Sequence, residues 1–217
     1  MQIKELTLFS KDINKQKTFY SEVLGLEQVL DTVNEISFKV GESILNFKYK
    51  SEITPSHVAF NIPSNSIEQA AKWLVQIGLA IDSNGKYVTE FSDWKAKAVY
   101  FYDADNNIME FIARTELNLN SDMEFSSESI LAISEVAIAT NSIKQIYNDI
   151  NAIRPIEIFD GNFERFCALG NNHGLFIIID KNKKKWYPTD DVADSSDFII
   201  KGDYNFRFEG GRIKQIL

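Results

Sequence analysis

Three stretches of the sequence share one pattern: Ile3-Lys4-Glu5-Leu6-Thr7-Leu8, Ser56-His57-Val58-Ala59-Phe60-Asn61 and Ile133-Ser134-Glu135-Val136-Ala137-Ile138. Each carries one metal-capable side chain on one face of an alternating strand, and each is followed by an amphipathic helix. The chain therefore contains an internal repeat. Because strand side chains alternate with period 2, Glu5 and His57 can converge if the first two repeats pair.

The segments that follow each opening strand have the same order: helix, then three strands. In the first repeat a helix begins after Ser10 or Asp12 and ends at Gly25, and extended runs follow at 28–31, 35–40 and 43–49. In the second, a helix begins near Ser66 and ends at Gly78. Its last two strands, 97–102 and 108–113, are joined by a turn rich in Asp and Asn, residues that tolerate left-handed backbone.

The polar residues 115–129 are typical of a linker, and a third copy begins at Ile130. It has a strand, a helix and extended runs near 156, 163–169 and 175–180. The tail adds a strand at 197–201 and a hairpin of 204–208 and 212–217. We therefore expect paired modules at 1–114 (1–52 and 53–114), a linker, and a third module with its tail at 130–217. The tail strands or a second subunit should cover the open sheet edge of that third module.

Composition excludes several function classes. The 217 residues carry a formal net charge of −8, which disfavours nucleic acid, because binding to phosphates depends on clustered Lys and Arg. No apolar run is long enough to span a bilayer and the start lacks a signal peptide, so we expect a soluble, cytoplasmic protein with no membrane partner. The single cysteine, Cys167, is interpreted as a small buried apolar residue.

Two segments carry a family resemblance: Lys17-Thr18-Phe19-Tyr20-Ser21-Glu22-Val23-Leu24-Gly25-Leu26 and Asp103-Ala104-Asp105-Asn106-Asn107-Ile108-Met109-Glu110-Phe111. With the repeated order of elements, they resemble the vicinal oxygen chelate superfamily, which includes glyoxalase I, bleomycin-resistance proteins, fosfomycin-modifying transferases and extradiol dioxygenases. The resemblance covers residues 1–114 well and 130–180 more faintly. It implies an α+β fold of repeated βαβββ modules whose mixed, curved sheet forms a cleft.

The resemblance also implies a ligand set for a metal. In that superfamily the ligands lie on the first and last strands of paired modules, which correspond here to Glu5, His57 and Glu110, with Asn46 at the fourth position. Two carboxylates and one imidazole suit Zn, Ni, Mn, Mg or Fe(II), with open positions for substrate oxygens. Glu110 or Glu5 would also serve as the base for proton transfer.

The third copy is expected to hold no metal. Aligning its turn with the Asn106-Asn107 turn puts Leu175 where Glu110 stands, so Glu135 is interpreted as a polar strand residue. His173 is interpreted as a loop residue, and the lysine-rich run 181–186 as a solvated loop.

These features favour a metal-dependent enzyme of the lyase, isomerase or dioxygenase type that acts on a small oxygenated molecule. Extradiol dioxygenases and fosfomycin transferases use two histidines and one glutamate as ligands. Since Glu5 stands in place of one of these histidines, oxygen chemistry at Fe(II) is less favoured here. The alternative is a metal-free binding protein of the bleomycin-resistance type, a homodimer that holds an aromatic or cationic ligand. Tyr100 and Tyr102 share one strand face and would line the cleft in either case. A scaffold with neither metal nor ligand is a third interpretation.

Overall fold

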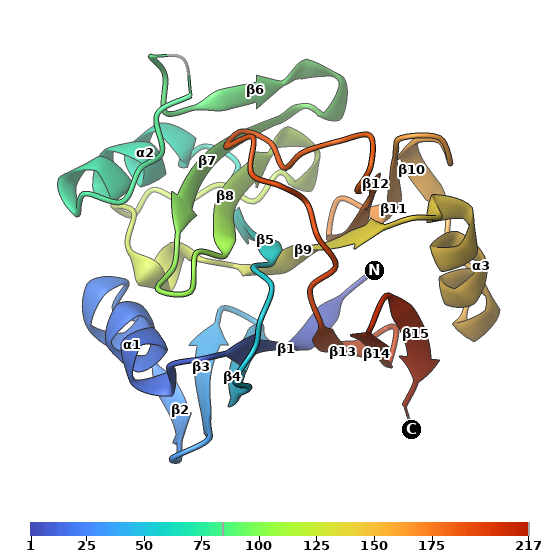
Figure 1. Cartoon of the computed structure of the whole chain (residues 1–217). Coiled ribbons are helices and arrows are strands. Elements are labelled where there is room, and N and C mark those ends of the chain that lie inside the picture. Colours follow the sequence, from blue (N-terminus) through green and yellow to red (C-terminus); the bar gives the residue numbers. More distant parts are fainter. Residues whose placement is uncertain (84, 217) are drawn as a thin grey trace.

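The computed structural model describes residues 1–83 and 85–216 as an α+β fold in which β-strands far outnumber helices (Figure 1). The elements are β1 (Ile3–Ser10), α1 (Ile13–Thr18), β2 (Gln28–Asp31), β3 (Glu35–Val40), β4 (Ser43–Tyr49), β5 (His57–Ile62), α2 (Ile67–Gln76), β6 (Thr89–Phe91), β7 (Ala96–Tyr102), β8 (Ile108–Arg114), β9 (Ala132–Thr140), α3 (Ile143–Ile153), β10 (Ile158–Gly161), β11 (Phe166–Asn171), β12 (Gly174–Asp180), β13 (Phe198–Gly202), β14 (Phe206–Glu209) and β15 (Arg212–Gln215). The expected βαβββ order therefore occurs three times.

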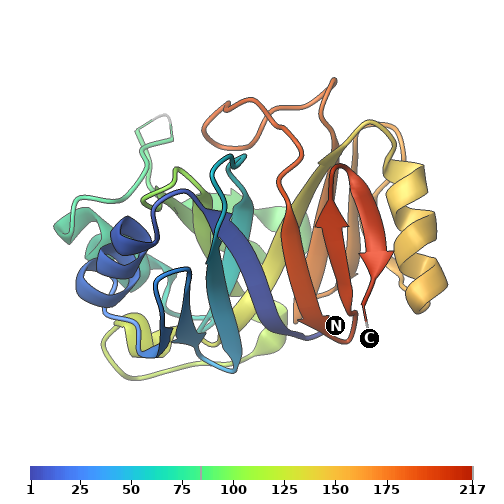
Figure 2. The same cartoon turned by 60° about the horizontal axis from the view of Figure 1, so that its bottom comes forward.

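The strands form two sheets, and their order corrects the expected pairing of modules. Sheet A has the order β15-β14-β13-β1-β4-β3-β2, and sheet B has the order β10-β11-β12-β9-β5-β8-β7-β6. The first module thus pairs with the tail strands, and the second pairs with the third (Figures 1 and 2). The prediction that the first two modules pair with each other is wrong. The edge of the third module was expected to be covered by the tail strands or by a second subunit; it is covered by β5 of the second module, and the tail strands pair with β1.

Free strand edges explain this arrangement. In each module the opening strand runs parallel to the last strand of the same module, as β1 with β4, β5 with β8 and β9 with β12. Its other edge would be left with unpaired N–H and C=O groups. The free edge of β5 takes β9 in antiparallel pairing, and that of β1 takes β13. Every opening strand consequently lies inside a sheet.

The two sheets enclose one main hydrophobic core with their facing sides, because side chains alternate between the two sides of each strand. Phe60, Phe111 and Phe176 of sheet B and Phe47 and Phe198 of sheet A belong to it, all fully buried. On the opposite side of sheet B lies a second, smaller apolar cluster that includes Ala59, Tyr100 and Trp186. This second side carries the candidate site.

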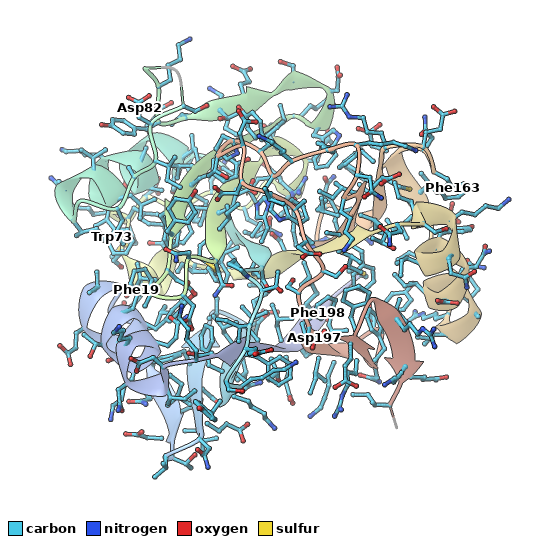
Figure 3. All side chains as sticks on the ribbon, viewed as in Figure 1. Phe19, Trp73, Asp82, Phe163, Asp197 and Phe198 are labelled. Atoms are coloured by element: carbon cyan, nitrogen blue, oxygen red, sulfur yellow. The ribbon has the colours of Figure 1, made fainter. Side chains whose placement is uncertain are left out.

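The helices close the core at its flanks. Phe19, where α1 continues into a π-helical turn, stacks on Phe101 of β7 with ring centroids 6.4 Å apart. Trp73 of α2 packs on Phe111 of β8 at 6.1 Å, and both aromatic residues of the helices are labelled in Figure 3. Phe125, from the segment expected as a linker, is buried against Trp73, so this segment also covers the core. None of the helices among the described residues is long and apolar enough to cross a membrane.

A buried carboxylate ties the first module to the second. Asp103, in the turn between β7 and β8, accepts hydrogen bonds from the Gln16 amide (2.9 Å), the Tyr20 hydroxyl (3.0 Å) and the side chain and backbone of Asn107 (2.7 and 2.9 Å). Burial raises the pKa of this carboxyl, and the hydrogen bonds oppose that shift. The Asp-rich turn and the aromatic helix, recognised separately in the sequence, therefore contact each other.

We expect Asp103→Ala to lower the free energy of unfolding by about 3 kcal/mol or more, because it leaves several buried donors without an acceptor. Tyr20→Phe removes a single donor and should cost about 1 kcal/mol. The matched control is Glu5→Gln, which breaks an exposed ion pair with Lys201 and should change stability by less than about 0.5 kcal/mol. Urea unfolding of the three variants measures this, and equal losses would contradict the role given to Asp103.

Candidate functional site

Two carboxylates flank one small residue in the middle of sheet B. Ala59 on β5 is in register with Glu110 on β8 and with Glu135 on β9. Residues in register on neighbouring strands point to the same side of a sheet, and His57 lies two positions before Ala59 on that side. Because alanine has only a methyl group, it leaves open space between the two carboxylates. The site is thus built by the second and third modules together.

Above this row lies a pocket of about 530 Å3, a size suited to a small molecule. His57, Glu110 and Glu135 line it. Its walls are aromatic, and the rings come from β6 and the turn after it, from β7, from β11 and from the connection between β12 and β13. These residues are Phe91, Trp94, Tyr100, Phe166, Trp186 and Tyr187.

The connection 181–197 covers the pocket on its way from sheet B to sheet A (orange to red in Figure 1). The Trp186 ring meets the imidazole of His57 edge-on, with centroids 5.6 Å apart. The Tyr102 hydroxyl donates a hydrogen bond of 2.6 Å to Asp191, and the hydroxyls of Thr89 and Tyr187 lie 3.2 Å apart. These contacts fasten the connection to β6 and β7 and hold its rings over the site.

His57 and Glu110 form a pair at the floor of the pocket. The imidazole Nε2 lies 3.0 Å from the Glu110 carboxylate, and both side chains are largely buried. Tyr100 is in register with Glu110 on the neighbouring strand. Burial, together with the Glu110 carboxylate, raises the pKa of the Tyr100 hydroxyl well above its usual value, so the phenol stays protonated.

Glu135 has a different partner. Its carboxylate accepts a hydrogen bond from the guanidinium of Arg114, the last residue of β8, and the two form a buried ion pair. Burial raises the pKa of Glu135 to about 7, the Arg114 charge opposes this shift, and the neighbouring Glu110 adds to it. The Glu135 carboxylate is thus already engaged by a positive group of the protein.

The donor set in this arrangement does not fit a tightly held divalent cation. Three oxygen or nitrogen ligands are a minimum for such a site, and one of the three side chains here, Glu135, is bound to a guanidinium. Throughout residues 1–83 and 85–216, no three His, Cys, Asp or Glu side chains are grouped so that they could hold a metal ion. A positive guanidinium beside the carboxylates also opposes a second cation.

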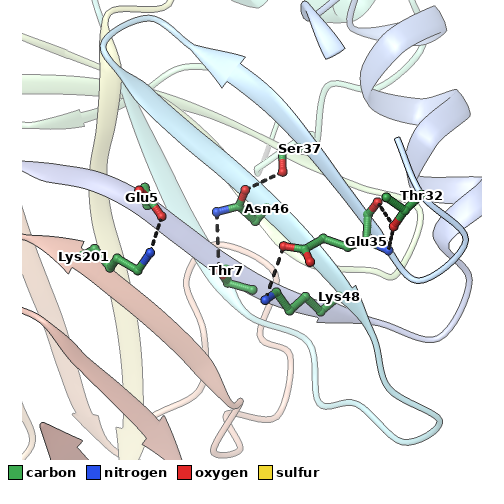
Figure 4. A network of polar contacts seen from close by, with 8 residues as sticks. All are labelled: Glu5, Thr7, Thr32, Glu35, Ser37, Asn46, Lys48 and Lys201. Carbon is green, nitrogen blue, oxygen red and sulfur yellow. Dashed lines mark hydrogen bonds and ion pairs between the residues drawn. The ribbon is translucent and has the colours of Figure 1, made fainter. Parts of the chain in front are cut away.

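The expected convergence of Glu5 with His57 is wrong. Glu5 lies on β1 in sheet A, on the outer side of that sheet, and its carboxylate accepts a 2.8 Å hydrogen bond from Lys201 of β13 (Figure 4). His57 belongs to sheet B. The physical reason is the pairing of strands, because β1 has the tail strand β13 as its neighbour and not β5.

Asn46 lies near Glu5 on the outer side of sheet A and also outside the pocket. Its amide oxygen accepts a 2.6 Å hydrogen bond from Ser37, and its amide nitrogen donates to Thr7 at 3.4 Å (Figure 4). Tyr100 lines the pocket, whereas Tyr102, on the same face, points to the covering connection through its contact with Asp191. His57, Glu110 and Tyr100 are therefore the predicted residues that the structure brings together.

Sequence reasoning missed Glu135 as a pocket residue, although a signal was present. Ser134-Glu135-Val136-Ala137 repeats Ser56-His57-Val58-Ala59 position by position. The registers also correct the alignment of the third module: His57 pairs with Ile108 and Glu135 with Leu175, so the counterpart of Glu110 is Ile177 and not Leu175. Ile177 lines the pocket and supplies no ligand atom.

Arg114, Trp186 and Tyr187 were also missed. The run from Lys181 to Trp186, interpreted as a solvated loop, places Lys184 in the pocket with its ammonium 4.4 Å from the centre of the Phe166 ring. No sequence pattern predicts which loop lies over a sheet, because that depends on where the next strand pairs. The adjacent aromatic residues Trp186 and Tyr187, next to a run of lysines, were the feature of the sequence that could have indicated a segment packed over a pocket.

The chain is similar to several known proteins, and the similarity to one solved structure, from Bacillus subtilis, extends to the fold. No protein-family model matches the chain. Fosfomycin resistance protein FosX of Listeria monocytogenes is 25% identical over 124 residues, which cover 52% of this chain and 90% of FosX. The structure of a putative dioxygenase from Bacillus subtilis matches 82% of this chain and 63% of its own length, with a TM-score of 0.59 and 17% identity. A FosX variant solved with Mn(II) and a dihydroxypropylphosphonic acid matches 55% of this chain and 94% of its own, with a TM-score of 0.42 and 23% identity.

The raised pKa of Glu135 predicts a pH dependence of stability. Its value is about 7 in the folded protein against an ordinary value of 4.5. Between these values the folded state keeps a proton that the unfolded chain has lost. The free energy of unfolding therefore falls as the pH rises from about 4.5 to about 7, by at most about 3 kcal/mol. Urea unfolding at several pH values should show this decline in the wild type and a weaker one in Glu135→Gln, and parallel curves would contradict it.

Proposed function

This chain has the vicinal oxygen chelate fold, and we propose that it is a small-molecule-binding protein whose pocket between the second and third modules takes an aromatic cation without a metal ion. The observation that carries the proposal is the composition of the pocket wall, where aromatic rings stand beside carboxylates while Glu135 is already bound by Arg114. Because one fold can carry many activities, the residues of the pocket, and not the fold, indicate the function.

The rings provide surfaces for stacking and for cation–π contact. Trp94 lies 6.0 Å from Phe166, and Tyr187 lies 6.0 Å from both Tyr100 and Phe91, measured between ring centroids. An aromatic ligand gains free energy from such walls through area burial and edge-to-face contact. A cation over the face of a ring gains about 0.5 to 2 kcal/mol, with the larger value in a desolvated site.

Charge gives the pocket a preference for cations. Five carboxylates line it, and Lys184 is the lysine among the lining residues. Asp160 is held in place by a 2.6 Å hydrogen bond from the indole of Trp94, and Glu110 stands at the floor beside His57. The protein as a whole has a formal net charge of −8. A positive ligand is therefore attracted to the pocket and an anionic one is repelled.

A divalent-metal-dependent lyase, isomerase or dioxygenase is the second candidate. The 3.0 Å contact of His57 with Glu110 favours it, because an imidazole paired with a carboxylate in a pocket can move a proton of a bound molecule. The engaged Glu135 and the distant Glu5 count against the metal that this candidate requires. For this reason we favour a binding function over a metal-dependent catalytic one.

The test is a titration with benzyltrimethylammonium in the presence of a chelator, followed by tryptophan fluorescence. Trp94 and Trp186 line the pocket and report on it, whereas Trp73 is packed in the core. We expect saturable binding of the cation and binding of phenylacetate that is at least about tenfold weaker. Trp186→Leu should weaken the cation by roughly 3- to 30-fold, the equivalent of one cation–π contact.

Trp73→Phe is the matched control, since it removes a tryptophan far from the pocket and should leave the affinity unchanged. Glu110→Gln should lower the affinity for the cation and not for a neutral aromatic such as benzyl alcohol. Preference for phenylacetate would refute a cation site. Binding that appears only when Mn(II) replaces the chelator would refute the metal-free proposal and favour the enzyme.

A further inference from the structure

Arg114 occupies an unusual position in sheet B. It is the last residue of β8, on the same strand face as Glu110 and Ile112, which both line the pocket. Its side chain is 1% exposed and is one of the largest fully buried side chains among the described residues. The guanidinium binds Glu135 and lies 5.7 Å from the centre of the Trp94 ring. A permanent positive charge is therefore fixed behind the pocket wall.

Stability alone is a weak explanation for this arginine. Within the part of the chain that the structure describes, its Nε and Nη1 groups are buried with no hydrogen-bond partner. A buried ion pair whose remaining donors are unsatisfied does not outperform apolar residues of the same size. The guanidinium thus places a positive charge at this position without forming a fully satisfied hydrogen-bond network.

The carboxylates explain why a positive charge is needed there. Glu110 and Glu135 flank Ala59 on one side of the sheet, with His57 beside them. As they stand, these three side chains are not grouped so that they could hold a metal ion. Two carboxylates and an imidazole on one face of a sheet become a donor set for a divalent cation once Glu135 is free to turn toward the other two. Either an external cation or an internal one can neutralise the pair, and the two would compete for Glu135.

We propose that Arg114 determines the cofactor requirement of this pocket: it is an internal cation that holds Glu135 and excludes a divalent metal from a latent site formed by His57, Glu110 and Glu135. The inference concerns the same pocket as the proposed function but does not depend on which ligand binds there. Removal of the guanidinium leaves Glu135 free to turn toward Glu110 and His57, and removes the charge that opposes a second cation.

The experiment is calorimetric titration of the purified protein with Mn(II) alone. The wild type should bind no Mn(II) up to millimolar concentration. Arg114→Met should bind one ion per chain, at least about 100-fold more tightly than the wild type, because three ligands are then available. The double variant Arg114→Met with Glu135→Gln should lose that binding. Arg154→Met, which removes an exposed arginine, is the control and should behave as the wild type.

Loss of the buried arginine can also reduce folding, so thermal unfolding with and without Mn(II) accompanies the titration. A latent site predicts that Mn(II) raises the melting temperature of Arg114→Met and not that of the double variant. If Arg114→Met does not fold, Arg114→Leu, which likewise removes both the positive charge and every donor to Glu135, is tested in its place for Mn(II) binding and for the shift in melting temperature.

Two results would overturn the inference. One is stoichiometric Mn(II) binding by the wild type that Glu135→Gln abolishes, since Arg114 would then not exclude the metal. The other is a folded Arg114 variant that binds no more Mn(II) than the wild type, since no latent site would exist. Neither depends on the titration with the aromatic cation, so failure of this inference is distinguishable from failure of the proposed function.

Discussion

The antiparallel pairing of β5 with β9 is the constraint on which the rest of this structure depends. It joins the second and third modules into one sheet and sets Ala59 between Glu110 and Glu135. Both strands are buried almost along their whole length, so a shift of register by one residue would turn every apolar side chain to the wrong face. The register that buries the core therefore also fixes the spacing of the polar groups in the pocket.

The first module contributes no side chain to the pocket lining, yet it is firmly part of the molecule. Its sheet closes the core beneath sheet B, and its helix reaches Asp103 through Gln16 and Tyr20. Because Asp103 lies in the turn that connects β7 to β8, this contact also supports the strand that carries Glu110. On the outer side of sheet A, Glu5 pairs with Lys201, and the buried side chain of Asn46 forms hydrogen bonds with Ser37 and Thr7.

The electrostatics of the pocket follow from its depth in the sheet. His57 pairs with Glu110 and Arg114 pairs with Glu135, while Glu90, Asp93 and Asp160 are the other carboxylates of the lining and lie beside aromatic rings. Buried charges need partners of opposite sign, whereas charges near solvent do not. The carboxylates of the floor are thus paired within the protein, and the other acidic residues lie toward solvent, an arrangement that suits a cation whose aromatic surface contacts the walls.

The sequence by itself determined the modules. Period-2 alternation, helix stops at Gly25 and Gly78 and the Asp103–Asn107 turn predicted the order of strands and helices and the α+β class, and they placed His57, Glu110 and Tyr100 on faces that line one pocket. These are local properties, since alternation and turn chemistry act over a few residues.

Only the tertiary structure decided which opening strands became neighbours. Alternation of side chains predicts the face of the strand on which a residue lies, but it does not predict which strand pairs beside it in the sheet. That choice followed from the free edges of β1, β5 and β9 and from the tail, and it separated Glu5 from His57, brought Glu135 and Arg114 into the site and laid Trp186 over it. Pairings between distant segments depend on burial and edge satisfaction over the whole chain, and no local pattern contains them.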